Sequence, residues 1–340
     1  MGSREGGTEV LGALTLTCCC CGHGRFAAAG SYMLSTRSDV GLSQGPDAPA
    51  HSLVSCANCS HVMVHPVPSE EEIRQYYLGG DYWRSRGFRD ESGNRGWREI
   101  LTSNSSLWER YHRARLQLRF LLDHADLPVD ARILDCGSGL APFLYHCRQM
   151  GFTDLHALEP SPEVCGFLDR QGVVTYPMLL ETFIARNDLP RFDLIVLSHV
   201  VEHLGGPDEL LEGLRRLLSD RAILFVETPY QDHLSPYPRG LHLHFFNEVS
   251  MKHLLTKCGY KVIVIQSRRF NPLEAAASKI LYLVYGKRFL MKRRGTVKNL
   301  LENRFVRVLH RFGLRPLKRL VGLKINIFID SQDLIALATR

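Results

Sequence analysis

The chain has 340 residues, of which 45% are hydrophobic, and a formal net charge of +7. This length is enough for one large domain or two modest ones, and the hydrophobic fraction is ordinary for a globular protein. No apolar run approaches the roughly 20 residues of a membrane-spanning helix. Glu5 and Glu9 argue against a signal peptide. We therefore expect a cytoplasmic protein whose ten cysteines need not form disulfides.

Two Cys-x-x-Cys pairs are the first distinctive pattern along the chain, Cys18 with Cys21 and Cys56 with Cys59. Two such pairs can place four thiolates tetrahedrally around zinc, so we predict one structural zinc ion held by these cysteines. The alternative is a metal-free or redox-sensitive loop. The spare donors nearby in sequence are Cys19, Cys20, His61 and His65.

Helices are predicted between the cysteine pairs and the main domain. Ser69 followed by Glu72 forms a capping box, which marks the start of a helix. Apolar residues recur at helical spacing between Ser105 and Asp126. We expect this second helix to cover the mouth of the main domain.

From Ala131 onward, short apolar segments alternate with helical patterns, which indicates a parallel sheet with helices on both faces. We predict a doubly wound α/β fold of seven strands, the last of them antiparallel. The expected strands are residues 132–135, 155–158, 173–176, 193–197, 222–226, 261–265 and 333–339.

The segment Ile133–Ala141 is typical of a strand, a tight glycine turn and the start of a helix. Gly137 and Gly139 let the backbone approach a ligand, and the helix aims free N–H groups into the same space. A dinucleotide site requires a third glycine where this chain has Pro142, and it disfavours an anion such as Asp135. The pattern therefore suits a cationic ligand; the alternative is a plain strand-turn-helix.

Glu159 lies 20 residues after Gly139, at the end of the second expected strand. A carboxylate there can accept both ribose hydroxyls of a nucleoside, although it could also cap the next helix. The Asp-x-Gly-x-Gly pattern resembles motif I of class I S-adenosylmethionine (SAM) methyltransferases, with Ala141 at the last glycine position. The resemblance implies SAM as cofactor and a Rossmann-like methyltransferase sheet. The predicted cofactor-binding residues are Asp135, Gly137, Ser138, Gly139, Glu159, Pro160, Met178, Leu179 and Ser198.

A second resemblance concerns the N-terminal part. The cysteine pairs, followed within residues 66–77 by Pro-x-Pro-Ser-Glu-Glu-Glu and Tyr-Tyr, resemble the zinc-bearing start of methyltransferases of the ubiquinone-methyltransferase-like group. The resemblance spans about residues 56–266. It implies a saccharide or small metabolite as the methyl acceptor.

The candidate catalytic residues follow the fourth expected strand. His199, Glu202 and His203 are spaced so that one helical turn could present them together. His242 or His244, from a loop on the same sheet edge, could reach the acceptor site, with a structural role for the other, and we include His244 among the candidates. A histidine can deprotonate or orient an acceptor hydroxyl. The alternative is a polar pocket wall without proton transfer. An Asn/Asp-Pro-Pro-Tyr/Phe sequence is absent here, which argues against a methyltransferase for exocyclic amines.

The same segment resembles the Glu-x-x-Glu-His of metal-assisted oxygen methyltransferases, but His199 stands in place of the first glutamate. This change disfavours a hard cation such as magnesium, and imidazoles suit a softer ion. We therefore predict a site without metal, in which His203 is the base or orienting group and Glu202 is its support.

The net charge is unevenly distributed. Arg268–Lys324 contains 16 Lys/Arg and two acids, which makes this segment +14 and leaves −7 for the rest of the chain. Its apolar residues recur at helical spacing, which fits an anionic membrane surface or a lipid-linked substrate. Nucleic acid is a less favoured partner, and a solvated helical cap is a further alternative.

We therefore predict a cytoplasmic SAM-dependent methyltransferase, peripheral at the membrane, that methylates oxygen or carbon of a saccharide or another small acceptor. The alternatives are an RNA 2′-hydroxyl methyltransferase and a non-catalytic SAM- or zinc-binding interaction protein. The predicted regions are a flexible tail (1–16), a zinc-knuckle region (17–68), a helical cap and linker (69–125), a SAM-binding core (126–267), a basic helical insert (268–329) and a final core strand (330–340).

Overall fold

A computed structural model describes residues 16–31, 51–69, 71–73, 88, 94–234, 241–269 and 332–340. The predicted tail, apart from its last residue, and nearly all of the predicted basic insert lie outside these residues. Within the described ranges, each helix is too short or too polar to span a membrane.

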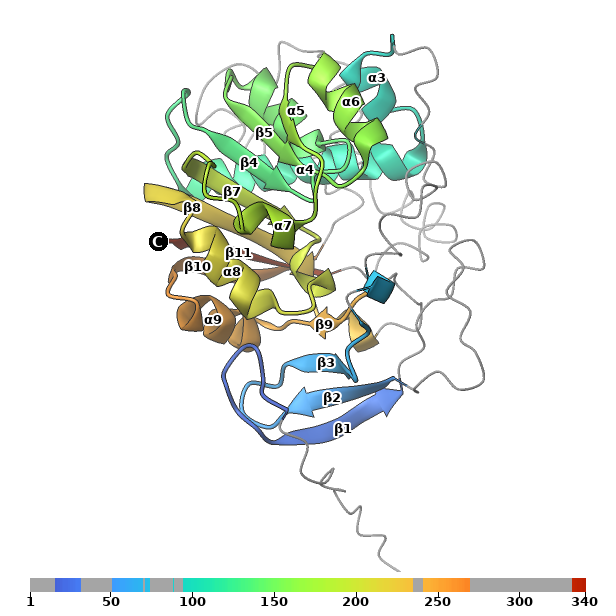
Figure 1. The fold of residues 1–340 in the computed structure, drawn as a ribbon, viewed down its shortest axis with the longest axis vertical. Coiled ribbons are helices and arrows are strands. Elements are labelled where there is room, and N and C mark those ends of the chain that lie inside the picture. Colours follow the sequence, from blue (N-terminus) through green and yellow to red (C-terminus); the bar gives the residue numbers. More distant parts are fainter. Residues whose placement is uncertain are drawn as a thin grey trace, which may run out of the picture. The chain divides into compact units, whose positions relative to one another are not determined.

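Seven strands form the large sheet at the centre of the molecule, in the order β10-β11-β8-β7-β4-β5-β6 (Figure 1). The five strands from β8 to β6 run parallel, whereas β11 pairs antiparallel with β8. The chain order reverses between β4 and β7. This topology confirms the predicted doubly wound, Rossmann-like sheet. The bounds are β4 (Ile133–Cys136), β5 (Leu155–Leu158), β6 (Val174–Tyr176), β7 (Phe192–Ser198), β8 (Leu218–Pro229), β10 (Lys261–Arg269) and β11 (Gln332–Thr339).

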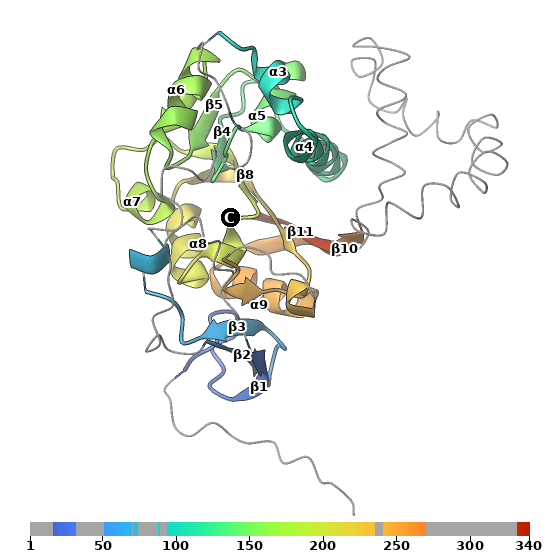
Figure 2. The ribbon, with the colours of Figure 1, turned by 90° about the vertical axis from the view of Figure 1, so that its right-hand side faces the viewer.

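The side chains of the buried strands alternate between two separate cores. In β4, Ile133 packs into the core formed with α3, α4, α5 and α6, and Leu134 packs into the core formed with α7, α8 and α9. Alternation is expected because successive side chains of a strand point to opposite faces. Figure 2 shows the helices on both sides of the sheet. Their bounds are α3 (Trp97–Leu101), α4 (Ser105–His124), α5 (Pro142–Gln149), α6 (Pro162–Arg170), α7 (Leu180–Ile184), α8 (Pro207–Arg215) and α9 (Glu248–Lys257).

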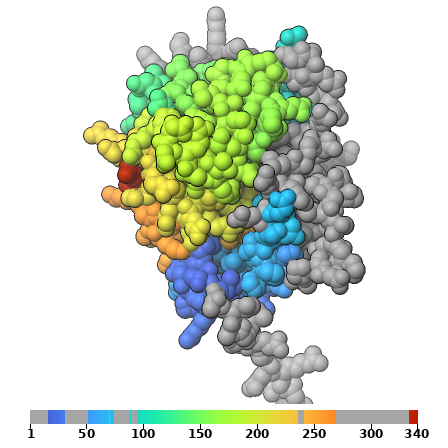
Figure 3. Space-filling model, in the orientation of Figure 1, coloured from blue at the N-terminus to red at the C-terminus, as the bar shows by residue number. Residues whose placement is uncertain are grey.

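A second, smaller sheet contains the N-terminal segments. Its antiparallel order is β1 (Phe26–Ser31), β2 (Ser52–Cys56), β3 (Val62–His65) and β9 (His244–Phe245). The fourth strand, β9, comes from the segment between β8 and α9, about 180 residues after β3 in sequence. The two parts of the protein therefore share a sheet, and Figure 3 shows the blue N-terminal residues packed beneath the orange and yellow segments.

Each Cys-x-x-Cys pair lies in a tight turn. The N–H of Gly22 donates to the carbonyl of Cys18 (2.8 Å), and the N–H of Ser60 donates to that of Cys56 (3.0 Å). Gly22 and Ser60 follow the second cysteine of each pair and have left-handed backbones, with φ of 74° and 55°. The two turns are thus alike, although only the first has a glycine at the position that favours one.

The predicted helix starts are confirmed at two points. The backbone N–H of Ser69 donates to the Glu72 carboxylate (2.7 Å), and the N–H of Glu72 donates to the Ser69 hydroxyl (3.3 Å), as in a capping box. The long helix α4 begins after Asn104, whose side chain accepts a hydrogen bond from the N–H of Leu107. Its buried face packs on α5.

Candidate cofactor and acceptor site

The turn after β4 depends on the backbone freedom of its two glycines. Gly137 and Gly139 have φ of 62° and 54°, in the left-handed region that glycine adopts readily. A Cβ atom on Gly137 would lie 2.7 Å from Cγ2 of Val200, in the loop after β7. Ala141 also has a positive φ, of 48°, and Pro142 opens α5. The turn therefore places the start of α5 close to the end of β7.

Two buried carboxylates lie beside this turn. Glu159, at the end of β5, accepts hydrogen bonds from the N–H groups of Gly139 (2.9 Å) and Ser161 (3.1 Å). A carboxylate oxygen can accept two hydrogen bonds, and acceptors of this kind suit the hydroxyl groups of a ribose. Burial, followed by the neighbouring Glu159, raises the pKa of Asp135 to about 8. A cation beside Asp135 would offset the unfavourable burial of its charge.

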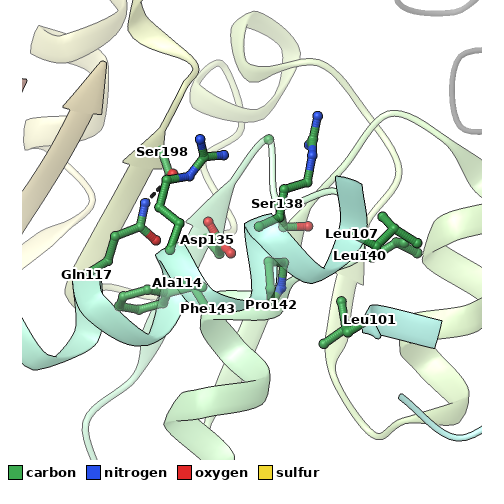
Figure 4. Close-up of a pocket in the computed structure, with 13 residues that line it drawn as sticks. Leu101, Leu107, Ala114, Gln117, Asp135, Ser138, Leu140, Pro142, Phe143 and Ser198 are labelled. Atoms are coloured by element: carbon green, nitrogen blue, oxygen red, sulfur yellow. Dashed lines mark hydrogen bonds between the residues drawn. The ribbon is translucent and has the colours of Figure 1, made fainter. Parts of the chain in front are cut away.

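A pocket opens between α4 and the glycine turn (Figure 4). The predicted residues Asp135, Gly137, Ser138 and Ser198 line it, and α4 contributes the rest of one wall. The position of α4 confirms the helix predicted over the mouth of the domain. The residues of α4 in this wall are Leu107, Arg110, Arg113, Ala114 and Gln117.

The polar residues of α4 were not among the predicted site residues. Gln117 is buried, and its amide donates to the Ser198 hydroxyl (2.7 Å) and to the Glu227 carboxylate. Arg110, Arg113 and Gln117 have helical i, i+3, i+7 spacing, which places them on one face. This stripe was visible in the sequence, but polar stripes on helices usually face solvent.

The other predicted cofactor-binding residues follow adjacent parallel strands at the same edge of the sheet. Gly139 belongs to the turn after β4, Glu159 and Pro160 follow β5, and Met178 and Leu179 follow β6. Because the carboxyl ends of parallel strands meet at one edge, these residues share the edge on which the pocket opens. This is the edge where α/β sheets of this type bind ligands.

The candidate catalytic residues lie just beyond β7. His199 leaves the strand with a φ of 56°, and Val201–His203 form a short 3-10 turn. Oε1 of Glu202 lies 3.4 Å from Nδ1 of His199 and 3.8 Å from Nε2 of His203. The hydroxyl of Thr228 donates to Oε2 of Glu202 (3.0 Å). The structure thus brings His199, Glu202 and His203 together as predicted.

Burial shifts the pKa values of Glu202 and His199. The pKa of Glu202 is raised to about 7, mainly because the side chain is desolvated, and desolvation also lowers the pKa of His199. Among the described residues, neither Oε1 of Glu202 nor Nε2 of His199 has a hydrogen-bond partner, although both atoms are buried. Their nearest charged neighbours are the two histidines for Oε1 of Glu202, and Oδ1 of Asp333, 3.7 Å away, for Nε2 of His199.

His203 is held by the segment before β9. Its Nδ1 lies 2.5 Å from the carbonyl oxygen of Leu241, so Nδ1 carries the proton that makes this bond. The rings of His203 and His242 are 4.7 Å apart in an edge-on arrangement, and Nδ1 of His242 lies 2.6 Å from the Asp232 carboxylate. Of the two histidines in this loop, His242 is therefore the one that contacts His203.

Residues 107–265 match the family described as a methyltransferase domain. The chain thus contains a segment similar to a methyltransferase domain. The match runs from α4 into β10, so it includes the glycine turn, Glu159 and the segment His199–His203. The enzyme class predicted from the sequence, a SAM-dependent methyltransferase, is thereby confirmed. Among curated proteins, none matches the chain.

Several solved structures resemble this methyltransferase remotely. One is a SAM-dependent methyltransferase from Archaeoglobus fulgidus, with 16% identity over 71% of this chain and 97% of that chain and a TM-score of 0.44. Another is a phosphoethanolamine N-methyltransferase from Haemonchus contortus, with 15% identity, 82% and 62% coverage and a TM-score of 0.48. A third, from Mesorhizobium loti, has 14% identity, 70% and 99% coverage and a TM-score of 0.42. Similarity at this level leaves the acceptor of this methyltransferase open.

The four cysteines predicted to hold zinc come together in the methyltransferase. Their sulfur atoms all lie within 4.8 Å of one another. The Sγ atoms of Cys18 and Cys59 are 3.6 Å apart, as are those of Cys21 and Cys56. All ten cysteines of the chain are free thiols.

His244 lies in different surroundings from the predicted acceptor site. Its Nδ1 is 3.0 Å from Nε2 of His61 and 3.8 Å from Sγ of Cys19, and its ring stacks on Phe246. The reason is structural, because β9 pairs with β3 and thereby carries His244 into the small sheet. His242, and not His244, lies beside His203. We call His199, Glu202, His203 and His242 the acceptor group.

Proposed function

We propose that this methyltransferase transfers the methyl group of SAM to an oxygen or carbon atom of a saccharide or another small acceptor. The observation that carries the proposal is the histidine–glutamate group at the end of β7. Ser198, the last residue of β7, lines the cofactor pocket, and His199 begins the catalytic group. The last pocket residue of β7 and the first residue of the catalytic group are therefore adjacent in the chain.

The residues at the sheet edge fit SAM. When bound, SAM supplies an electrophilic methyl group on a sulfonium ion. Asp135, once ionised, provides the negative charge that a cationic ligand favours, and Glu159 provides acceptors for ribose hydroxyls. Arg113 or Arg110 is suited to a carboxylate such as that of the methionine part.

His203 is suited to remove the proton of the acceptor. Because its Nδ1–H donates to the carbonyl of Leu241, the neutral ring has its lone pair on Nε2. Nε2 of His203 would take the proton of the acceptor. The methyl group that SAM supplies would bond to the acceptor atom as its bond to sulfur breaks, and S-adenosylhomocysteine would leave with that electron pair. Glu202, 3.8 Å from Nε2, stabilises the imidazolium that results, and thus acts as a positioning residue. His199 and His242 orient the acceptor.

We further infer that Cys18, Cys21, Cys56 and Cys59 hold a structural zinc ion. Tetrahedral zinc with Zn–S bonds of about 2.3 Å places its sulfur ligands about 3.8 Å apart. The two sulfur–sulfur distances of 3.6 Å are close to this value. Such a zinc domain supports membership of the ubiquinone-methyltransferase-like group.

The basic segment Arg268–Lys324 would dock this enzyme on an anionic membrane surface that carries its acceptor. Its charge of +14 favours such docking, and added salt should weaken it because ions screen exposed charges. Vesicles with and without anionic lipid test this. Absence of binding to anionic vesicles at low salt would contradict the membrane role.

The proposed reaction is tested by measuring S-adenosylhomocysteine formed with a panel of acceptors. The panel contains saccharides, other small hydroxyl compounds, carbon nucleophiles, amines and RNA. We expect turnover with a saccharide or another hydroxyl or carbon acceptor. Turnover with amines or RNA alone would contradict the proposed acceptor class, and SAM binding without any turnover would contradict the catalytic role.

A further inference from the structure

A second group of metal-ligand atoms lies beside the four cysteines of the predicted zinc site. Sγ of Cys19, Sγ of Cys20 and Nε2 of His61 all lie within 4.8 Å of one another. Nδ1 of His244 is next to two of them, 3.8 Å from Sγ of Cys19 and 3.0 Å from Nε2 of His61. None of these four residues belongs to the predicted zinc site.

Four of the six distances within this group are close to those of ligands around one ion. Tetrahedral zinc with two sulfur and two nitrogen ligands places the sulfurs about 3.8 Å apart, sulfur and nitrogen about 3.6 Å apart and the nitrogens about 3.3 Å apart. The corresponding distances are 3.8 Å for Cys19–Cys20, 3.7 Å for Cys19–His61, 3.8 Å for Cys19–His244 and 3.0 Å for His61–His244. Four of the six pairs therefore agree with one tetrahedral centre, and Cys20 and His61 lie within 4.8 Å of each other. His244 lies outside the group formed by Cys19, Cys20 and His61, so it would have to move toward Cys20 to complete the coordination.

The surroundings also suit a metal site. Cys20, His61 and His244 are buried, and Cys19 is half-buried. Phe246 packs against both imidazole rings, at 4.8 Å from His61 and 5.9 Å from His244. A metal ion would use all four side chains as ligands, in place of the weak thiol contacts that Cys19 makes with Cys20, His61 and His244.

We propose that Cys19, Cys20, His61 and His244 form a second zinc site, distinct from the Cys18, Cys21, Cys56 and Cys59 site. Two thiolates and two imidazoles are a ligand set that zinc favours. Three of the ligands come from the N-terminal segments, and the fourth comes from β9. The second ion therefore joins the N-terminal sheet to the methyltransferase domain.

The position of His244 gives this site a link to the acceptor group. His244 is two residues after His242, whose ring contacts His203. An ion on His244 fixes the backbone of this short segment. The second zinc site is thus expected to hold His242 and the Leu241 carbonyl in place against His203.

The test is a titration of the metal-free full-length protein with Zn²⁺, followed by a competing dye and by elemental analysis. Wild-type protein should take up two ions per chain. The double variant Cys19→Ser/Cys20→Ser should take up one, and Cys56→Ser/Cys59→Ser should also take up one. Cys147→Ser, in a buried core cysteine outside both groups, is the matched control and should keep two.

Each outcome of the titration decides between the alternatives. One ion in the wild type that persists in Cys19→Ser/Cys20→Ser would overturn the second site. One ion that is lost from that variant but retained in Cys56→Ser/Cys59→Ser would support the second site and contradict the first. Loss of all zinc from either folded double variant would show one shared ion and overturn a distinct second site. If a variant fails to fold, two ions in the wild type still support two sites, and one ion contradicts two simultaneous sites.

Discussion

The cofactor edge and the acceptor group of this methyltransferase are adjacent, but they are built in different ways. At the cofactor edge, backbone N–H groups in the turns after β4 and β5 hold Glu159. In the acceptor group, distant segments hold the side chains, the Thr228 hydroxyl holding Glu202 and the Leu241 carbonyl holding His203. Local backbone geometry therefore fixes the first region, and contacts between distant segments fix the second. Changes in the two regions should therefore affect different properties.

The largest effect is expected from His203→Ala. Loss of a general base typically lowers a rate by about 10²–10⁴-fold, and the cofactor edge is unchanged in this variant. We expect turnover to fall by that factor while SAM affinity, measured by calorimetry, stays nearly constant. His253→Ala, on the exposed side of α9, is the control. Turnover within about threefold of wild type would remove His203 from catalysis.

A backbone change at the cofactor edge should mainly lower stability. In Gly137→Ala, a left-handed backbone costs about 1–2 kcal/mol and overpacking against Val200 about 1–3 kcal/mol in free energy of unfolding. Gly151→Ala is the control, because Gly151 also has positive φ but no atom near its Cβ position. The pair Gly137→Ala/Val200→Ala should recover part of the loss. Equal stability of both single variants would show that contact with Val200 is unimportant.

Glu159→Ala should weaken SAM binding but leave the acceptor group intact. Hydrogen bonds to a charged group contribute about 1.5–3 kcal/mol, which corresponds to about 10–150-fold in affinity. Calorimetry with SAM measures the change, and thermal unfolding checks that the turn at Gly139 survives. Glu181→Ala, an exposed acid at the start of α7, should bind SAM normally. Unchanged affinity in Glu159→Ala would refute the ribose role.

The most gradual effect is a pH dependence of SAM affinity. The pKa of Asp135 is raised to about 8, above its unfolded value, so ionisation of this group destabilises the ligand-free fold as pH rises toward 8. A cationic ligand favours the ionised form, and SAM affinity should therefore rise up to about tenfold per pH unit below pH 8 and then level off. Asp135→Asn should bind more weakly and lose this dependence. A wild-type affinity that is flat from about pH 6 to 8 would contradict the assignment.

The sequence was sufficient for most of the fold and for the cofactor edge, because both depend on local patterns. β5 has the predicted bounds, and β4 differs by one residue at each end. By contrast, β8 begins at Leu218, four residues before the expected start, because its polar first residues carry no strand pattern. The acceptor group was predicted only for His199, Glu202 and His203, which are close in sequence.

The partners of these three residues could not be predicted because tertiary packing brings them together. Asp232 contacts His242, and His242 contacts His203, across separate loops. The choice between His242 and His244 depends on the pairing of β9 with β3, which no local pattern reveals. The same pairing brings His244 to Cys19, and therefore hides the second group of metal ligands from sequence analysis.

The position of β9 in the small sheet also affects how the protein is made. Cys18 leaves the ribosome 226 residues before His244, which is 244 minus 18. At a synthesis rate of roughly 5–20 residues per second, about 11–45 s pass between the synthesis of Cys18 and that of the last strand of the small sheet. During synthesis the cysteine segments therefore exist as an incomplete sheet with an open edge at β3. Nascent chains of this enzyme should be vulnerable to thiol oxidation and edge-to-edge pairing in that interval, until Phe245 joins Val62.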